Sequence, residues 1–238
     1  GDIAIDSLRG KLYWINPVDK SIQRSNVDGS DPQTLIGGLG DPRGITLDEA
    51  GARLYWTDFS AGVIRSAALD GSAQLTVTTG LDNPVWIDFA PVQRVLYFVE
   101  SNQIDDNNDD RRIRRVNPDG SDLVTVAVGW PHSAPPDFQY QISGLAVNEA
   151  VGRIYWTDEE SFDAGFNRLN WITLNGEDPG AVLFNSEPSL MRGLAQDRNS
   201  FRLYWAEGFE SEYSYGPPFA IRSSFADGDI SGQPLATN

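Results

Sequence analysis

The segment Leu54-Tyr55-Trp56-Thr57-Asp58 decides the fold, because variants of it recur along the 238-residue chain. The other copies lie at 12–16, 96–100, 154–158 and 203–207. A second motif, Ile45-Thr46-Leu47-Asp48 in this unit, precedes every copy, and an Asp-Gly or Asn-Gly pair follows every copy. Three motifs that return five times in one order indicate an internal repeat of about forty residues.

Each repeat is predicted to form four short strands. In the second unit these strands are expected at 44–48, 53–57, 63–69 and 74–79, with Asp70-Gly71 as the turn of the last hairpin. Four-stranded repeats of this length are typical of β-propeller blades. The sequence therefore predicts an all-β protein, a β-propeller of five four-stranded antiparallel blades in a single domain over 1–238. The expected blades are 2–43, 44–85, 86–143, 144–192 and 193–238.

The motif set resembles the YWTD, or class B, repeats of low-density lipoprotein receptor-like proteins. The resemblance also includes an I-x-R-x-x-x-D-G element, present at Ile22/Arg24/Asp28 and Ile113/Arg115/Asp119 and lacking its Arg in the other units. It implies six blades where five units are counted, so a six-bladed propeller with one blade missing or degenerate stays the alternative. It further implies binding of protein ligands rather than catalysis, and an extracellular, cell-surface or periplasmic location.

The composition limits the classes of partner that the chain is expected to bind. A formal net charge of −16 and a pI near 4.3 oppose binding to nucleic acid or to an anionic membrane. No apolar run is long enough to enter a membrane, and the absence of Cys excludes disulfides and thiol chemistry. The acidity favours solubility, or attraction to a basic partner. Because residue 1 is Gly, a processed or trimmed chain is expected, and the oligomeric state is not indicated.

The repeated residues are expected to be scaffold, so function is sought where the repeat symmetry breaks. The interval from the repeat Tyr to the turn residue is 15 positions in units one and two, but 22, 20 and 23 in the later units. In an antiparallel blade, the loops between the second and third strands lie on the same face as the links to the next blade. The insertions of blades three to five are therefore predicted to gather on one face, where binding loops commonly lie.

The predicted ligand is a protein or peptide with basic or cationic groups, because these insertions combine carboxylates with aromatic side chains. Packing of the same aromatics onto the scaffold is the structural alternative. The candidate site also includes two arginines, each just before the first strand of its blade, and a Trp that replaces a repeat Gly. The candidate ligand-binding residues are Arg43, Trp86, Trp130, Tyr140, Glu159, Phe162, Asp163, Arg192, Phe209, Glu210, Glu212 and Tyr213.

Metal binding and catalysis have weaker support. Asp105, Asn107 and Asp109 have the alternating spacing of a calcium loop, but Asp110 and Val116 replace its required Gly and Glu. A solvated acidic loop is the alternative, so no cofactor is expected other than calcium. His132 is the single His of the chain. The alternative function is a metal-dependent lactone or ester hydrolase with its site at the mouth of the propeller channel.

Overall fold

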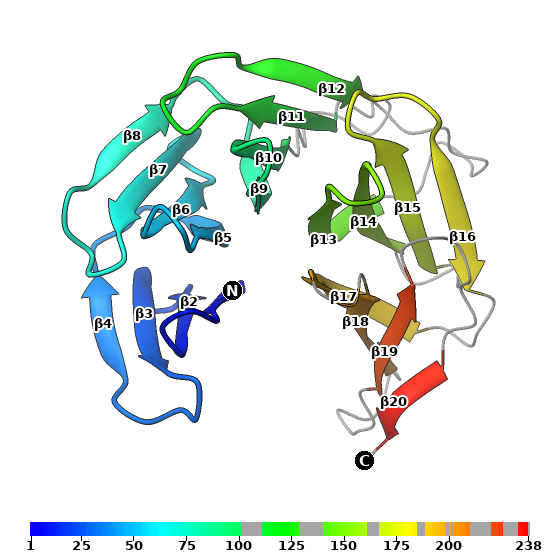
Figure 1. Cartoon of the computed structure of the whole chain (residues 1–238), viewed down its shortest axis with the longest axis horizontal. Helices are drawn as coiled ribbons and strands as arrows, with labels where there is room; N and C mark the ends of the chain where they lie inside the picture. Colours follow the sequence, from blue (N-terminus) through cyan, green and yellow to red (C-terminus); the bar gives the residue numbers. More distant parts are fainter. Residues whose placement is uncertain are drawn as a thin grey trace. The chain divides into compact units, whose positions relative to one another are not determined.

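The computed structural model describes residues 1–100, 111–128, 140–160, 167–184, 189–198, 200, 202–209, 220–225 and 233–237. Within these residues the chain forms twenty strands and no helix. The strands make five four-stranded antiparallel sheets, each with consecutive strands as neighbours (Figure 1). The all-β class and the four-stranded blades predicted from the repeat are thereby confirmed.

The chain divides into two compact units, which are described separately. Unit 1 comprises Gly1–Ile104 and Asp109–Trp130, and unit 2 comprises Asp105–Asn108 and Pro131–Asn238. The strands of unit 1 are β1 (Ile3–Asp6), β2 (Lys11–Asn16), β3 (Ser21–Asn26), β4 (Gln33–Ile36), β5 (Pro42–Asp48), β6 (Arg53–Asp58), β7 (Val63–Ala68), β8 (Leu75–Thr78), β9 (Pro84–Ala90), β10 (Val95–Glu100), β11 (Arg112–Val116) and β12 (Val124–Val128).

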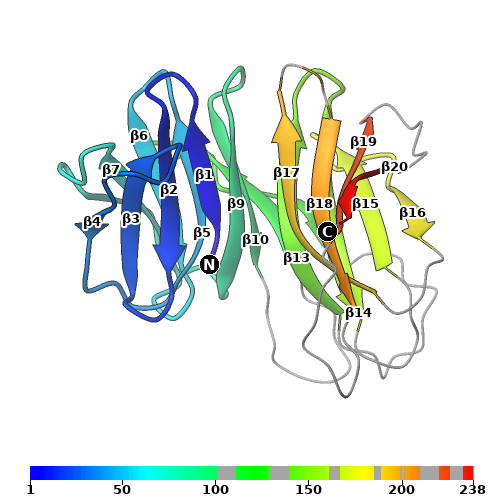
Figure 2. The same cartoon turned by 90° about the horizontal axis from the view of Figure 1, so that it is seen from below.

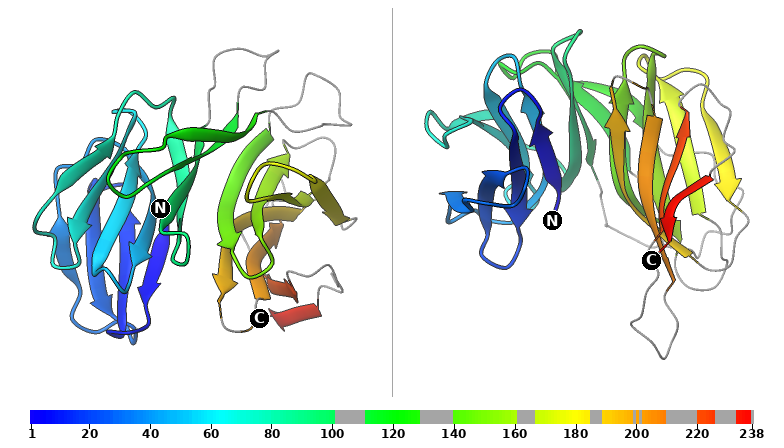
Figure 3. Two further views of the ribbon diagram at one scale, coloured as in Figure 1. Left: turned by 45° about the horizontal axis from the view of Figure 1, so that its top comes forward. Right: turned by 60° about the horizontal axis from the view of Figure 1, so that its bottom comes forward.

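Unit 2 has two sheets. Its strands are β13 (Tyr140–Asn148), β14 (Arg153–Glu160), β15 (Asn167–Thr173), β16 (Gly180–Phe184), β17 (Ser189–Asp197), β18 (Arg202–Phe209), β19 (Ala220–Phe225) and β20 (Gln233–Thr237). In unit 1 the three sheets stand side by side, and β4, β8 and β12 lie outermost (Figures 1 and 2). In unit 2 the first strands of the two sheets, β13 and β17, are neighbours (Figure 3).

The first strand of the second sheet begins earlier than the repeat motif predicts, whereas β1 begins with its motif at Ile3. In the second sheet β5 begins at Pro42 rather than at residue 44, because a bulge between Pro42 and Ile45 lets the ladder with β6 continue. Gly44 lies in this bulge and packs against the backbone of β9. A Cβ there would lie 3.1 Å from the Cα of Trp86 and closer still to the Val85 carbonyl oxygen. This close approach explains why the position requires Gly.

The repeat Tyr and Trp point to opposite faces of their sheet, as the period of a strand requires. Tyr13 belongs to a buried cluster with Ile45, Leu47 and Trp56 of the next sheet. Tyr55 likewise packs with residues of the third sheet, its ring 5.9 Å from that of Phe89. Burying each such aromatic contributes roughly 2–3 kcal/mol to folding. The Tyr-Trp pair therefore joins neighbouring sheets and is scaffold.

The first sheet of unit 1 has no preceding sheet within that unit, and its apolar side chains show this. Ile45 and Leu47 are 3% and 7% exposed, whereas Ile3 and Ile5, at the same positions of β1, are 59% and 57% exposed. The two pairs occupy equivalent positions of the repeat and differ in whether a neighbouring sheet covers them.

Candidate binding face

Short backbone hydrogen bonds bring the second–third strand turns of unit 1 together with its sheet-to-sheet links. Leu39 donates to the carbonyl oxygen of Lys20 (3.0 Å), and Leu81 donates to that of Gly62 (3.0 Å). Phe59 donates to the carbonyl oxygen of Asp41 at 2.8 Å. We call this surface, formed by residues 17–20, 37–41, 59–62 and 79–83, the loop face. In unit 1 it lies where the strand directions predict it.

Arg43 is the predicted site residue that the structure defines best. It is exposed at the start of β5, its Nη2 lies 2.9 Å from Oδ2 of Asp41, and its guanidinium lies 4.9 Å from the ring centre of Phe59. A cation–π contact of an exposed Arg contributes about 0.5–1 kcal/mol. Asp41 and Phe59 hold the exposed Arg43 side chain beside the loop face, where a partner can reach it.

The acidic residue at the end of the repeat motif fixes the backbone beneath this cluster through hydrogen bonds. Asp58 is buried, and its carboxylate accepts the backbone N–H groups of Gly40 (3.1 Å), Asp41 (3.0 Å) and Ala61 (3.3 Å). One carboxylate thus fixes both the link into β5 and the turn after β6.

In the third sheet an ion-pair cluster surrounds Glu100, which ends β10 as Asp58 ends β6. Glu100 is fully buried, with Oε1 2.9 Å from Nη1 of Arg114, and it also accepts the N–H of Asp82 at 3.3 Å. Arg112 lies 3.3 Å from the Asp82 carboxylate and 3.8 Å from that of Glu100. Because the acidic insertion of blade three follows directly after Glu100, this cluster fixes the point from which that insertion departs.

A second polar group lies at the first strands of the three sheets of unit 1. It consists of Asp2, just before β1, Thr46 on β5 and Asp88 on β9. Asp2 accepts the N–H of Ile45 at 2.9 Å, and the hydroxyl of Thr46 lies 3.3 Å from Oδ1 of Asp88. Burial raises the pKa of the Asp2 carboxyl to about 6, and the neighbouring Asp88 adds to the rise. Trp86, the predicted site residue that replaces a repeat Gly, is half-buried in β9 beside Gly44. Asp2 had no sequence signal, because it precedes the first clear motif.

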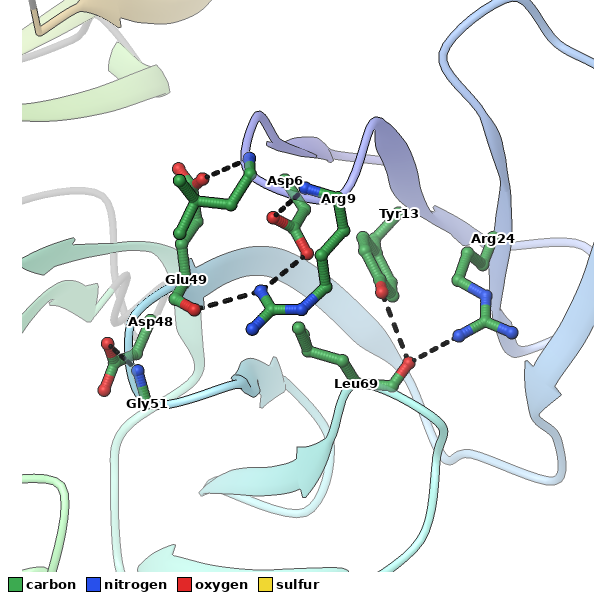
Figure 4. Close-up of polar contacts among 9 residues, drawn as sticks. Asp6, Arg9, Tyr13, Arg24, Asp48, Glu49, Gly51 and Leu69 are labelled. Carbon is green, nitrogen blue, oxygen red and sulfur yellow. Dashed lines mark hydrogen bonds and ion pairs between the residues drawn. The ribbon is translucent and has the colours of Figure 1, made fainter.

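The opposite side of unit 1 carries a different polar network (Figure 4). Arg9 bridges the buried carboxylate of Asp6 (3.1 Å) and the carbonyl oxygen of Glu49 (3.0 Å) in the next sheet. Arg94 in turn reaches Asp48 at 2.6 Å. These contacts join neighbouring turns through internal partners and stabilise the scaffold.

The Arg that lies beside the repeat Tyr comes from one of two positions in different sheets. This exchange of arginines was not predicted from the sequence. In the first sheet Arg24, on β3, donates to the Leu69 carbonyl oxygen beside the hydroxyl of Tyr13. Where the second and fifth sheets have Ser at that position, an Arg two residues before the repeat Tyr bonds the Ser. Arg53 donates to Ser66 at 2.7 Å and Arg202 to Ser223 at 3.0 Å. The signal was present in the sequence, because the strand-start Arg occurs where the later Arg is missing.

The fourth sheet has the same strand-start Arg. Its third strand carries Trp171 at the exchanged position, and Arg153 lies over that ring with 5.3 Å to the centroid. Each repeat Tyr therefore has an Arg at one of two fixed positions on its own sheet. This Arg is a structural element of the blade.

Four predicted loop residues are strand residues, which corrects their assignment. Tyr140 begins β13, opposite Glu160, and Glu159 lies in β14, opposite Gln141. Arg192 lies within β17 and Phe209 ends β18. The first hairpins of the fourth and fifth sheets are longer than those of the earlier sheets, so part of each insertion extends the ladder. The predicted residues outside the described part of the chain are Trp130, Phe162, Asp163, Glu210, Glu212, Tyr213, Asp105, Asn107 and Asp109.

Within the described ranges, no group of three or more His, Cys, Asp or Glu side chains is arranged to hold a metal ion. A membrane-spanning apolar helix is likewise not found among the residues that the structure describes.

Comparison with known proteins gives one family match. Residues 10–49 match the low-density lipoprotein receptor repeat class B. No curated protein sequence matches the chain.

Solved structures share the fold. A chain in the crystal structure of a nidogen/laminin complex is similar over 99% of this chain and 78% of its own length, with a TM-score of 0.75 and 22% identity. A putative TolB from Agrobacterium tumefaciens gives a TM-score of 0.58 at 15% identity, over 76% of this chain and 63% of its own. Kuenenia stuttgartiensis hydrazine synthase gives 0.63 at 11%, over 99% and 64%.

These matches agree with the resemblance drawn from the motifs. The class B match covers the first repeat, and the same motifs recur through the remaining four sheets. Residues 10–49 thus match a low-density lipoprotein receptor class B, or YWTD, repeat, and the chain has the β-propeller fold.

Proposed function

We propose that this propeller is an extracellular, non-catalytic module that binds a protein or peptide through its loop face. The observation that carries the proposal is the class B repeat on a propeller scaffold, because propellers of this family typically bind proteins. Similarity to a chain from a nidogen/laminin complex supports the same class of activity. The family also supports an extracellular location, which this proposal adopts.

Charge and geometry support the choice of face. In the sequence, long insertions follow the second strands of blades three to five, the kind of connection that forms the loop face in unit 1, and Glu100 with its two arginines lies at the start of the first of them. Arg43 and Phe59 add a cation and an aromatic ring of the kinds enriched at binding hot spots. The acidic insertions would then select basic or cationic groups on the partner.

The test is a binding screen against purified ectodomains of secreted and cell-surface proteins, laminin fragments included, with the whole chain immobilised. A hit is then measured with the double variant Arg43→Ala/Phe59→Ala. We expect its affinity to fall about tenfold or more, since hot-spot residues typically cost 2 kcal/mol or more when truncated. The matched control is Leu8→Ala/Val27→Ala, two exposed apolar side chains in turns of the opposite side, which should leave the affinity unchanged.

A second variant tests the acidic insertion. Replacing Asp105, Asp106, Asp109 and Asp110 with Asn should weaken binding and flatten its salt dependence, because the long-range attraction is removed. Unchanged affinity would remove this insertion from the site. Loss of affinity in the opposite-side control alone would place the partner on the other face.

The hydrolase alternative is tested in parallel with lactone and ester substrates, with calcium and with a chelator. No observation in the described residues favours it. Turnover that is lost on chelation would replace the binding proposal. A calcium-dependent rise in melting temperature, abolished by the four Asn substitutions, would instead assign a structural calcium to the Asp105–Asp109 segment.

A further inference from the structure

The turn between the third and fourth strands carries Asp-Gly in four repeats and Asn175-Gly176 in the fourth. This is the single Asn-Gly pair of the sequence. Asn175 is exposed and Gly176 has a positive φ of 85°. The backbone is the same as in the Asp turns, where Gly29, Gly71 and Gly120 have φ values of 82°, 84° and 88°. The chemistry of the side chain is the difference.

In an Asp turn the carboxylate is the acceptor of the following Ser. Asp28 Oδ1 accepts the Ser30 N–H at 2.9 Å and its hydroxyl at 2.6 Å, and these bonds lower the pKa of Asp28. Asp70 and Asp119 make the same two bonds with their own Ser residues. An ionised carboxylate is a poor electrophile, so these turns should form a succinimide more slowly at neutral pH than an Asn-Gly turn does.

The side chain of Asn175 is bonded differently from the Asp carboxylates, both at its amide oxygen and at its amide nitrogen. The Thr173 hydroxyl lies 2.6 Å from Oδ1, and its proton is shared with the Glu177 carbonyl oxygen, also at 2.6 Å. Nδ2 donates to Oε2 of Glu177 at 2.9 Å. A donor on the carbonyl oxygen polarises the amide carbon and stabilises the oxyanion formed when that carbon is attacked. A carboxylate at the nitrogen can guide a proton during departure of the amine.

We propose that Asn175 is a site of spontaneous covalent modification, with Gly176 as the nucleophile and Thr173 as the positioning residue. The Gly176 nitrogen, having lost its proton to solvent base, attacks Cγ of Asn175. The Cγ–Nδ2 bond breaks as Nδ2 takes up a proton from solvent, the nitrogen leaves as ammonia, and a five-membered succinimide remains. Water adds to one of the two imide carbonyls and opens the ring to Asp or to isoaspartate at position 175. The step needs no oxidant or reductant.

The modification changes the turn because it replaces the Asn175 amide, which donates a hydrogen bond to Glu177, with a carboxylate that can only accept one. The product has a carboxylate where Nδ2 donated to Glu177, so two negative charges face each other. The net charge becomes one unit more negative than −16. Isoaspartate also lengthens the backbone by one methylene between residues that now bond directly, since Gly176 donates to the Thr173 carbonyl oxygen at 2.9 Å. This side of the fourth sheet should loosen with age.

The test is to age the folded protein in mildly alkaline buffer at physiological temperature and to follow every Asn by peptide mass spectrometry, with isoaspartate detected by enzymatic methylation. Asn175 should convert first. Asn117 is the internal control, because Pro118 has no N–H with which to attack. Conversion at another Asn before Asn175, or none at Asn175, would overturn the proposal.

Two variants and one condition separate local chemistry from a merely exposed Asn. Thr173→Val should slow conversion several-fold, and Thr173→Ser, which keeps the hydroxyl, should restore it. The same measurement in urea should give slower conversion than in the folded protein. Faster conversion in urea would mean that the turn protects Asn175, through the bond from the Gly176 nitrogen to Thr173, and the proposal would be wrong.

Discussion

The hydroxyl of Thr57 donates to the Val85 carbonyl oxygen at 2.7 Å and accepts the Gly44 N–H at 2.9 Å. The Thr of the repeat motif therefore satisfies the N–H group released by the β5 bulge and joins the second sheet to the third. In unit 2 the same motif position has a different partner, because the Thr157 hydroxyl lies 2.9 Å from that of Ser143 on its own sheet.

Thr57→Val should lower the free energy of unfolding by about 1–3 kcal/mol, because it leaves a buried N–H and a buried carbonyl without their shared partner. The volume of the side chain is nearly unchanged, so packing contributes little. Urea unfolding at equilibrium measures the effect. Thr76→Val, on the exposed β8, is the control and should change stability by less than about 0.5 kcal/mol. Equal effects at the two positions would contradict the bridging role.

Gly44→Ala should destabilise by roughly 1–3 kcal/mol, because the added Cβ would meet the Val85 carbonyl oxygen and the β9 backbone, which cannot move away cheaply. Gly37→Ala is the matched control, since no atom lies within 4 Å of the added methyl. Thermal unfolding of both variants compares them. Similar melting temperatures would show that β5 and β9 are not held as closely as described.

The exchange of arginines predicts a rescue. Arg53→Ala should destabilise by about 1 kcal/mol through the lost bonds to Ser66 and to the Ala73 carbonyl oxygen. Adding Ser66→Arg recreates the arrangement of Arg24 in the first sheet and should recover most of the loss. Denaturation midpoints of the single and double variants decide the point. A double variant less stable than Arg53→Ala would show that the two positions are not equivalent.

The raised pKa of Asp2 predicts a particular pH dependence. The folded protein holds the Asp2 proton up to about pH 6, whereas a free Asp carboxyl has a pKa of 3.8. Folded protein therefore binds more protons between these values, so this group's stabilisation is present below pH 3.8 and is lost as pH rises towards 6. The full difference is on the order of 3 kcal/mol.

Asp2→Asn isolates this contribution, because Asn does not titrate. The stability of the variant relative to the unsubstituted protein should rise by up to the same amount between pH 4 and pH 7. Unfolding free energies over this range measure the difference. The lowered pKa values of Asp28, Asp70 and Asp119 act below pH 3.8, outside this window. A flat difference would show that Asp2 is not buried against Ile45.

The repeat predicted the scaffold well because its causes are local and periodic. Alternation on the second strand assigns Tyr55 and Trp56 to opposite faces, and a strand-end carboxylate such as Asp58 has turn N–H groups in reach. The Arg43 cluster was only partly predicted, because Asp41 and Phe59 meet it through the folding of a link against a turn. Tyr140 and Glu159 were misassigned because a count of inserted residues cannot distinguish a longer hairpin from a longer loop.

The exchange of arginines between two strands also changes how the five repeats of this chain should be compared. Compared position by position, the third-strand Arg is present in two of the five units and looks dispensable. Counted as a charge beside the Tyr, it is present in all five. The first unit carries cations at both positions, Lys11 and Arg24. A cation beside the repeat Tyr can thus be supplied from either of two strands, and this chain contains both arrangements.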